Sequence, residues 1–285
     1  MKTYLDCMSC FVRQALEAAR MATKDERVQR KVLDSVMGRL STLSFNATPP
    51  EIAQVVHGLV KEVTGDSDPY REIKKKQNQI ALNLFPRIKE MVTGSDDRLL
   101  GAVKMAIAGN VIDLGVQDEV KDIEGSIYDA FSSDLTIDSY DEFREVLTHS
   151  NLVLYLGDNA GEIVFDKILI EELKMIKRME IVFVVREKPI INDATMEDAQ
   201  FVGMEELTTV LSNGSDAPAT ILSQCSQEVC GLFSRADMII AKGQGNYESL
   251  NEEHRVFFLL KAKCPVIARD LAVNVGDMIL KGQKV

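Results

Sequence analysis

The stretch "NLVLYLGDNAGEIVFDKILI", residues 151–170, indicates the fold class of this chain. Its first six residues form a short β-prone apolar run, which is typical of a strand buried on both faces. After Gly161 the apolar residues take up helical spacing. The bend between strand and helix carries Asp158 and Asn159. A buried strand that turns directly into a helix predicts a βαβ unit and therefore a parallel sheet.

The same alternation continues along the C-terminal half of the chain. Further short β-rich runs lie at residues 180–185, 208–212, 238–243 and 265–269, and helical stretches separate most of them. We therefore predict an α/β fold, a three-layer α/β/α sandwich with a mostly parallel, Rossmann-like sheet.

The first 150 residues are almost wholly helical in pattern. In "NATPPEIAQVVHGLVKEV", Thr48 is a plausible helix cap, prolines follow in the first turn, and Glu51 completes a capping box. The segment 68–92 is a long amphipathic helix that we expect to bend or restart at Pro86. These patterns divide the chain into a helical N-terminal part, residues 1–110, and an α/β domain, residues 111–285, with a boundary somewhere between 95 and 150.

Composition limits the kind of protein. Of 285 residues, 46% are apolar and 27% charged, as in soluble globular proteins. The net charge of −11 argues against nucleic acid as a partner. The longest apolar runs are too short to span a bilayer, and the first ten residues lack a signal-peptide core. Five cysteines in so long a chain do not indicate a disulfide framework, so we expect a cytoplasmic protein with no membrane partner.

Polar side chains follow successive strands at their carboxyl ends, where ligands of open α/β sheets bind. Asp158 and Asn159 follow the first run and Asp193 the second, while Lys242 and Lys263 follow later ones. Carboxylate and amide oxygens suit Mg²⁺, Mn²⁺ and related ions, and nearby lysines suit phosphate. A tight turn and a helix cap would explain either acidic motif alone, but the repetition at successive strand ends favours a site.

Three other classes of site fit poorly. No G-x-G-x-x-G follows the first strand of the sheet, so a dinucleotide site is not indicated. "GDNAGE" lacks the pattern of a P-loop, and no G-x-S-x-G nucleophile elbow occurs.

The motifs "GDNAGEIVFD", "KPIINDATMEDA" and "ADMIIAKGQGNYESL" resemble those of the metal-dependent damage-control phosphatases, formerly domain of unknown function 89. "CMSCFVRQALEAAR", "TPPEIA", "DPYREIKKKQNQIAL", "GNVIDLG" and "LLKAKCPVIA" are similar to the stand-alone, cysteine-containing prokaryotic branch of that family. The resemblance follows nearly the whole chain in order. It implies a three-layer α/β fold and a divalent ion, Mn, Co, Ni or Mg, that assists hydrolysis of phosphate esters of small metabolites.

The resemblance also implies site residues. The metal ligands would be Asp158, Asn159 and Asp193, with Lys263 on the substrate phosphate and residues 242–246 bordering the substrate. Eukaryotic sugar-phosphate members carry Asp-Leu where this chain has Gln244 and Gly245, and Arg-Thr where it has Lys261 and Ala262, so a sugar-phosphate preference is not implied. The full set comprises catalytic Asp158, Asp193 and Lys263, and substrate-binding Asn110, Asp113, Glu162, Lys242, Gly243, Gln244, Gly245 and Asn246.

Asn110 and Asp113 enter that set from the pattern alone, because they share one face of an otherwise apolar helix and a buried helix needs partners for them. The expected mechanism is direct attack by a metal-held water. The sequence "DNA" leaves no second carboxylate two positions after Asp158, as an aspartyl-phosphate route would usually show. Glu162, one turn on, would order the ligands or contact the substrate.

The cysteines admit two interpretations. Cys7 and Cys10 form a CxxC, and Cys264 adjoins Lys263. If the N-terminal helices cover the strand ends, the three thiols would form a second metal or redox site; otherwise they are small buried residues.

Two other functions remain open from the sequence. The chain could be a non-catalytic metal- or metabolite-binding protein that uses the CxxC and the acidic strand ends. A Rossmann-type methyltransferase is a further alternative, which the lysine-rich rim disfavours.

Overall fold

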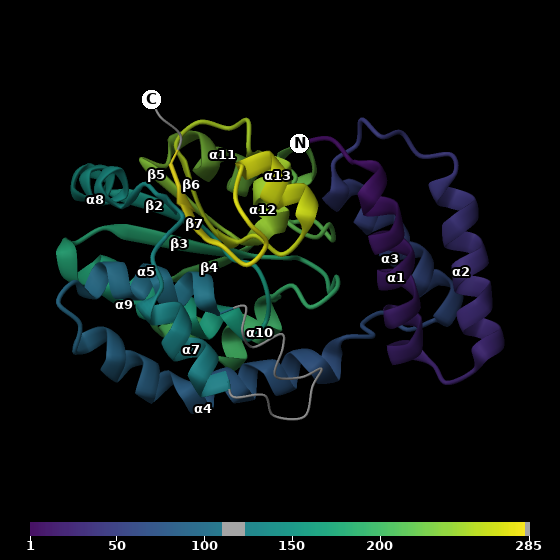
Figure 1. Ribbon diagram of the computed structural model, residues 1–285, viewed down its shortest axis with the longest axis horizontal. Coiled ribbons are helices and arrows are strands. Elements are labelled where there is room, and N and C mark those ends of the chain that lie inside the picture. The colour runs from purple at the N-terminus through teal and green to yellow at the C-terminus, as the bar shows by residue number, and fades with distance from the viewer. Residues whose placement is uncertain (110–122, 283–285) are drawn as a thin grey trace.

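The computed structural model describes residues 1–109 and 123–282 (Figure 1). Its sheet is formed by β1 (Ile137–Asp138), β2 (Leu152–Leu156), β3 (Glu180–Val185), β4 (Thr209–Ser212), β5 (Met238–Lys242), β6 (Val256–Lys261) and β7 (Met278–Lys281). In the described chain these strands lie in the order β1-β7-β6-β5-β2-β3-β4. All neighbours pair in parallel except β6 and β7. The predicted α/β class is confirmed.

Helices cover both faces of the sheet because its central strands are apolar on both sides. In β2, Val153 and Tyr155 face one apolar cluster, and Leu154 and Leu156 face the other. The first cluster includes residues of α5 (Arg98–Ala108), α7 (Ile123–Ser132), α8 (Tyr140–His149), α9 (Glu162–Ile176) and α10 (Met196–Phe201), with α4 (Arg71–Thr93) laid across them. The second includes residues of α11 (Gln227–Arg235), α12 (Gly243–Leu250) and α13 (Pro265–Leu271). This is the expected three-layer sandwich.

Three N-terminal helices form a unit of their own beside the sandwich (Figure 1). α1 (Leu5–Ala22), α2 (Glu26–Leu40) and α3 (Pro49–Thr64) share a separate apolar core. The capping box predicted from Thr48 and Glu51 starts α3 as expected. α4 and α5, by contrast, contribute to the core against the sheet. α5 is apolar on nearly all sides, and the core against the sheet buries it. The expected division of the chain after residue 110 stays a prediction.

One local prediction is wrong, and one of two alternatives in another is excluded. Residues 265–269, expected as a strand, begin α13, with Pro265 in its first turn, where proline's missing N–H costs nothing. The strand of this region is β6 instead, since a short apolar run does not distinguish strand from buried helix by its period. α4 runs unbroken from Arg71 to Thr93 with Pro86 inside it, so the helix does not restart there.

No helix in the described parts of the chain is both long and apolar enough to cross a bilayer.

Candidate active site

The chain reverses its direction of winding across the sheet between β2 and β5. From β2 it proceeds through α9 to β3 on one side, and from β5 through α12 to β6 on the other. The carboxyl ends of these two neighbouring strands therefore border the crevice in which open α/β sheets bind ligands. Asp158 follows β2 at this point, and Lys242 ends β5.

Backbone pairing brings the three predicted metal ligands together. Asn159 and Asp193 form an isolated antiparallel bridge between the loops that follow β2 and β3. On either side of it, Ala160 N–H donates to the Asn192 carbonyl over 2.9 Å, and Ala194 N–H donates to the Asp158 carbonyl over 2.8 Å. Two loops far apart in sequence thus keep a fixed register at the strand ends.

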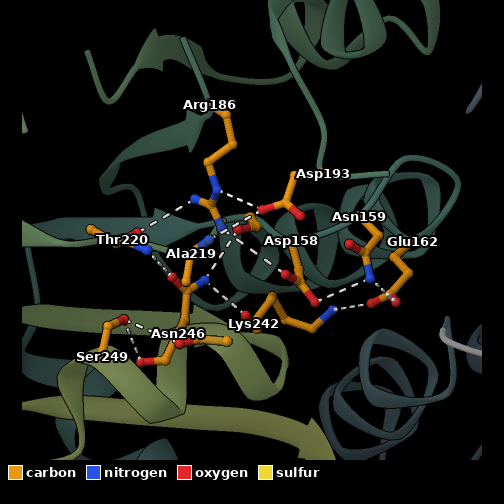
Figure 2. A network of polar contacts seen from close by, with 12 residues as sticks. Asp158, Asn159, Glu162, Arg186, Asp193, Ala219, Thr220, Lys242, Asn246 and Ser249 are labelled. Carbon is orange, nitrogen blue, oxygen red and sulfur yellow. Dashed lines mark hydrogen bonds and ion pairs between the residues drawn. The ribbon is translucent and has the colours of Figure 1, made fainter. Parts of the chain in front are cut away.

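Hydrogen bonds orient the side chains of these loops (Figure 2). Asn159 Nδ2 donates to Glu162 Oε1 over 2.9 Å and to Asp158 Oδ2 over 3.3 Å, which leaves Oδ1 as its potential ligand atom. Asp193 Oδ2 accepts from Arg186 Nε over 2.8 Å and from Ala219 N–H over 3.2 Å. Its other oxygen is then the one suited to a cation.

Like charges crowd the site. Burial, with Glu162 and Asp193 nearby, raises the pKa of Asp158 well above its usual range, although Lys263 and Arg186 oppose the shift. Burial also raises the pKa of Asp193, against the effect of Arg186. A cation between the two carboxylates would relieve this repulsion.

The donor set fits a hard divalent ion. Two aspartates and an amide oxygen are ligands that Mg²⁺ or Mn²⁺ takes while keeping several waters. Among residues 1–109 and 123–282, no three His, Cys, Asp or Glu side chains are grouped to hold a metal, so water and substrate would complete the coordination shell. In the described site four acidic groups face three cations, and a divalent ion offsets the excess. The acidic groups are Asp158, Glu162, Asp166 and Asp193, and the cations are Arg186, Lys242 and Lys263.

Lys242 lies buried against Asp166. Its side chain is 1% exposed, does not line the cleft, and donates to Asp166 Oδ1 over 2.8 Å. Although burial alone would lower it, the carboxylates of Asp166 and Glu162 raise the pKa of Lys242 above its ordinary value. Lys242 thus neutralises the buried carboxylate of Asp166. Its expected contact with the substrate phosphate stays a prediction.

Of the residues that follow Lys242, some line the cleft and others hold its loops in place. Gly243 has φ +81°, and a Cβ added to it would lie 1.8 Å from Asp158 Oδ2, so only glycine fits beside this carboxylate. Gln244 and Gly245 line the cleft, as expected. Asn246 is buried and ties loops together instead, since its Nδ2 donates to the Gly157 carbonyl and its Oδ1 accepts from Thr220 N–H.

A cleft of about 640 Å³ opens over the strand ends. One wall comes from the α/β layers and includes Asp158, Asn159, Asp193 and Lys263; the other comes from α1 and the start of α3. Lys263 is 36% exposed and lies 3.7 Å from Glu162 Oε1. It is therefore the predicted lysine that the structure places at the cleft.

All three cysteines of the predicted second site line this cleft. Cys10 Sγ accepts from Gln14 Nε2 over 3.5 Å, and Cys264 Sγ accepts from Gln244 Nε2 over 3.5 Å. Burial raises the pKa of Cys7. The thiols are free and not grouped as metal ligands in the described chain, so the metal interpretation gains no support and the redox interpretation stays a prediction.

Two further expected residues, Asn110 and Asp113, lie outside the described residues. Conversely, the predicted set of site residues omits Arg186 and Asp166. Arg186 is fully buried and bonds Asp193, and Asp166 is fully buried and accepts from Tyr155 and Lys242. The sequence did offer a signal for each residue: Arg186 is a charge directly after β3, and Asp166 is a charge one helical turn after Glu162.

Fold and site together define an α/β protein with an acidic, lysine-flanked cleft at the strand ends. The family model of the damage-control phosphatase ARMT1-like domain matches residues 3–279, and the chain belongs to that family.

Similar proteins cover its whole length. A protein named damage-control phosphatase from Pyrococcus horikoshii is 37% identical, over 100% of this chain and 99% of that one. A damage-control phosphatase of Archaeoglobus fulgidus is also 37% identical, over 96% and 97%. An uncharacterized protein of Methanocaldococcus jannaschii is 40% identical, over 96% and 93%. The crystal structure of a DUF89 family protein from Pyrococcus horikoshii superposes with a TM-score of 0.93 at 36% identity, covering 100% of both chains.

Proposed function

We propose that this protein is a metal-dependent phosphatase that hydrolyses phosphate esters of small metabolites. Membership of the damage-control phosphatase family supports the phosphatase part. The observation that carries the metal part is the bridge between Asn159 and Asp193, which sets three oxygen ligands side by side at the strand ends.

Asp158, Asn159 and Asp193 would hold the divalent ion. When bound, such an ion supplies a Lewis acid that activates water at neutral pH and neutralises charge on phosphoryl oxygens. Lys263, part-exposed at the cleft, binds the phosphate of the substrate and stabilises the charge that develops on its oxygens. Glu162 keeps both Asn159 and Lys263 in place, because it accepts from the first and lies 3.7 Å from the second.

Water attacks phosphorus directly in this proposal, and no phosphoenzyme forms. Gly243 packs directly against the Asp158 carboxylate, and Asn159 donates a hydrogen bond to it. A carboxylate fixed in this way suits a metal ligand better than a nucleophile. Asp158 or Asp193 takes the proton that the attacking water loses. The N-terminus of α9 lies beside the same loop, and its helix dipole favours an anion there.

A panel of phosphate esters, assayed with and without Mn²⁺, Co²⁺, Ni²⁺ and Mg²⁺, tests the function. We expect metal-stripped protein to be inactive and one of these ions to restore phosphate release. Metal binding without turnover of any ester would favour the non-catalytic binding protein. Acid quench during turnover should yield no acyl-phosphate on Asp158, and a stoichiometric one would disprove direct attack while leaving the phosphatase standing.

A further inference from the structure

The segment "KKKQNQ" of α4, residues 74–79, buries polar groups that the proposed chemistry does not use. Lys75 and Lys76 are exposed, whereas Lys74, Gln77 and Asn78 are 4%, 3% and 1% exposed. Burying an ammonium group and two amides costs several kcal/mol in total unless each finds a partner. Their partners show what this face of α4 does.

Asn78 contacts the loop of Asp158. Its Oδ1 accepts from the N–H of Gly161 over 2.6 Å, three residues beyond Asp158 and directly before α9. Its Nδ2 donates to Asp198 Oδ1 over 2.9 Å. One amide group thus joins the loop after β2 to α10, which follows the loop after β3.

Lys74 also contacts Asp198, the α10 residue that Asn78 binds. Its Nζ lies 3.1 Å from Asp198 Oδ2 and 3.5 Å from Asp68. Asp198 Oδ2 also accepts from Thr195 N–H and its hydroxyl, over 2.9 and 2.8 Å. Thr195 in turn forms an isolated backbone bridge with Arg186, directly after β3, and Arg186 bonds Asp193.

Gln77 completes the set. Its Oε1 accepts from Asn192 Nδ2 over 3.5 Å, one residue before Asp193. The partners just described belong to the two ligand loops, to α10, and to Asp68 in the connection from α3.

We propose that Lys74, Gln77 and Asn78, the α4 clamp, are positioning residues that keep the loops of Asp158–Asn159 and Asp193 in the register a metal needs. None of the three lines the cleft, so they act through the loops and do not touch the substrate. The inference rests on the proposed function only in taking these loops to be the metal site. Partners of this outer kind typically change metal affinity or activity about 10- to 100-fold when removed.

Asn78→Ala tests the clamp, with Lys75→Ala from the exposed face of α4 as its matched control. We expect Asn78→Ala to weaken Mn²⁺ binding about tenfold or more and to lower kcat with little change in KM. Lys75→Ala should match the wild type in both. A folded Asn78→Ala protein that binds Mn²⁺ within twofold of wild type would overturn the proposal.

Lys74 provides a second comparison that separates charge from packing. Lys74→Met should weaken Mn²⁺ binding, and Lys74→Arg, which retains the charge facing Asp68 and Asp198, should recover most of it. Equal affinities for the two variants would argue against the clamp.

Hydrogen exchange on wild-type, metal-free protein keeps the inference testable if the variants do not fold. The Gly161 amide should exchange slowly because Asn78 holds it, and exchange as fast as in an exposed loop would contradict the clamp. This readout needs no metal. If wild type and Asp158→Ala bind Mn²⁺ equally, the proposed metal site fails, while slow exchange at Gly161 still supports the connection.

Discussion

Gly243 lies closer to the Asp158 carboxylate than any side chain would allow. A Cβ there would lie 1.8 Å from Oδ2, and φ of +81° already disfavours L-residues. Gly243→Ala should therefore displace Asp158 and abolish measurable Mn²⁺ binding and turnover. Gly231→Ala is the control, because a Cβ at that position in α11 meets nothing within 4 Å. Calorimetric Mn²⁺ titration of both variants measures this, and wild-type affinity in Gly243→Ala would show that the carboxylate is not a ligand.

Lys263 is the cation placed to meet a substrate phosphate. A charge-assisted contact of this kind contributes about 1.5–3 kcal/mol, so Lys263→Ala should lower kcat/KM about tenfold or more, by raising KM, lowering kcat or both. Lys261→Ala, at the end of β6 and outside the cleft lining, should retain wild-type kinetics. Steady-state assays with one good ester decide the matter, and unchanged kinetics in Lys263→Ala would remove this lysine from the site.

For single residues, the sequence predicted where site residues lie better than it predicted their contacts. Asp158, Asn159 and Asp193 could be found because strand ends meet at one edge of a parallel sheet. The contact of Lys242 with Asp166 could not, because Asp166 lies one helical turn beyond Glu162 and carries no motif. The ion pair of Arg186 with Asp193 could not be predicted either, since full burial of an arginine depends on partners from other elements.

Among the elements, α3 makes stability depend on pH through His57. Burial lowers the pKa of His57 to about 4, whereas the unfolded value is about 6.5. Above pH 6.5 the ring is neutral in both states. Between pH 6.5 and 4 only the unfolded chain takes up the proton, so the free energy of unfolding should fall by about 3 kcal/mol from this group. Urea denaturation at a series of pH values should show a shallower fall for His57→Phe, and identical slopes would exclude His57 as the cause.

Helices and strands encoded by adjacent residues could be predicted from the sequence. Those that depend on contacts with distant parts of the chain could not. The capping box of α3 and the strand–turn–helix at 152–162 are encoded by adjacent residues. Residues 265–269 form a short, largely apolar and partly β-branched run, which is also typical of a strand. Only Pro265 at the first helical position indicated α13.

On the scale of the whole molecule, the helical unit and the sandwich share one cleft, to which each contributes cysteines. Cys10 and Cys264 line it from opposite walls, whereas Cys225 and Cys230 do not. Mn²⁺ with inorganic phosphate should therefore slow alkylation of Cys10 and Cys264 by iodoacetamide and leave Cys230 unchanged. Mass spectrometry of the labelled peptides measures the rates. Equal slowing of all the cysteines, or of none, would contradict a shared cleft that holds the phosphate.

Helical periodicity alone does not show with which core α4 and α5 pack. α4 and α5 are helices like those before them, but their apolar faces meet the sheet's core rather than the core of α1–α3. Which core a helix joins is a tertiary property, and the period of its sequence is the same in either case.

In the proposed function, one divalent ion, held by Asp158, Asn159 and Asp193, enables phosphate ester hydrolysis. The most direct test is to titrate Mn²⁺ into metal-stripped protein and follow bound metal and phosphate release in the same samples. We expect both to rise together and saturate at one ion per chain, and we expect both to be lost in Asp158→Ala. Phosphate release that is complete without bound metal, or that persists in a folded Asp158→Ala protein, would show that hydrolysis does not need this metal site.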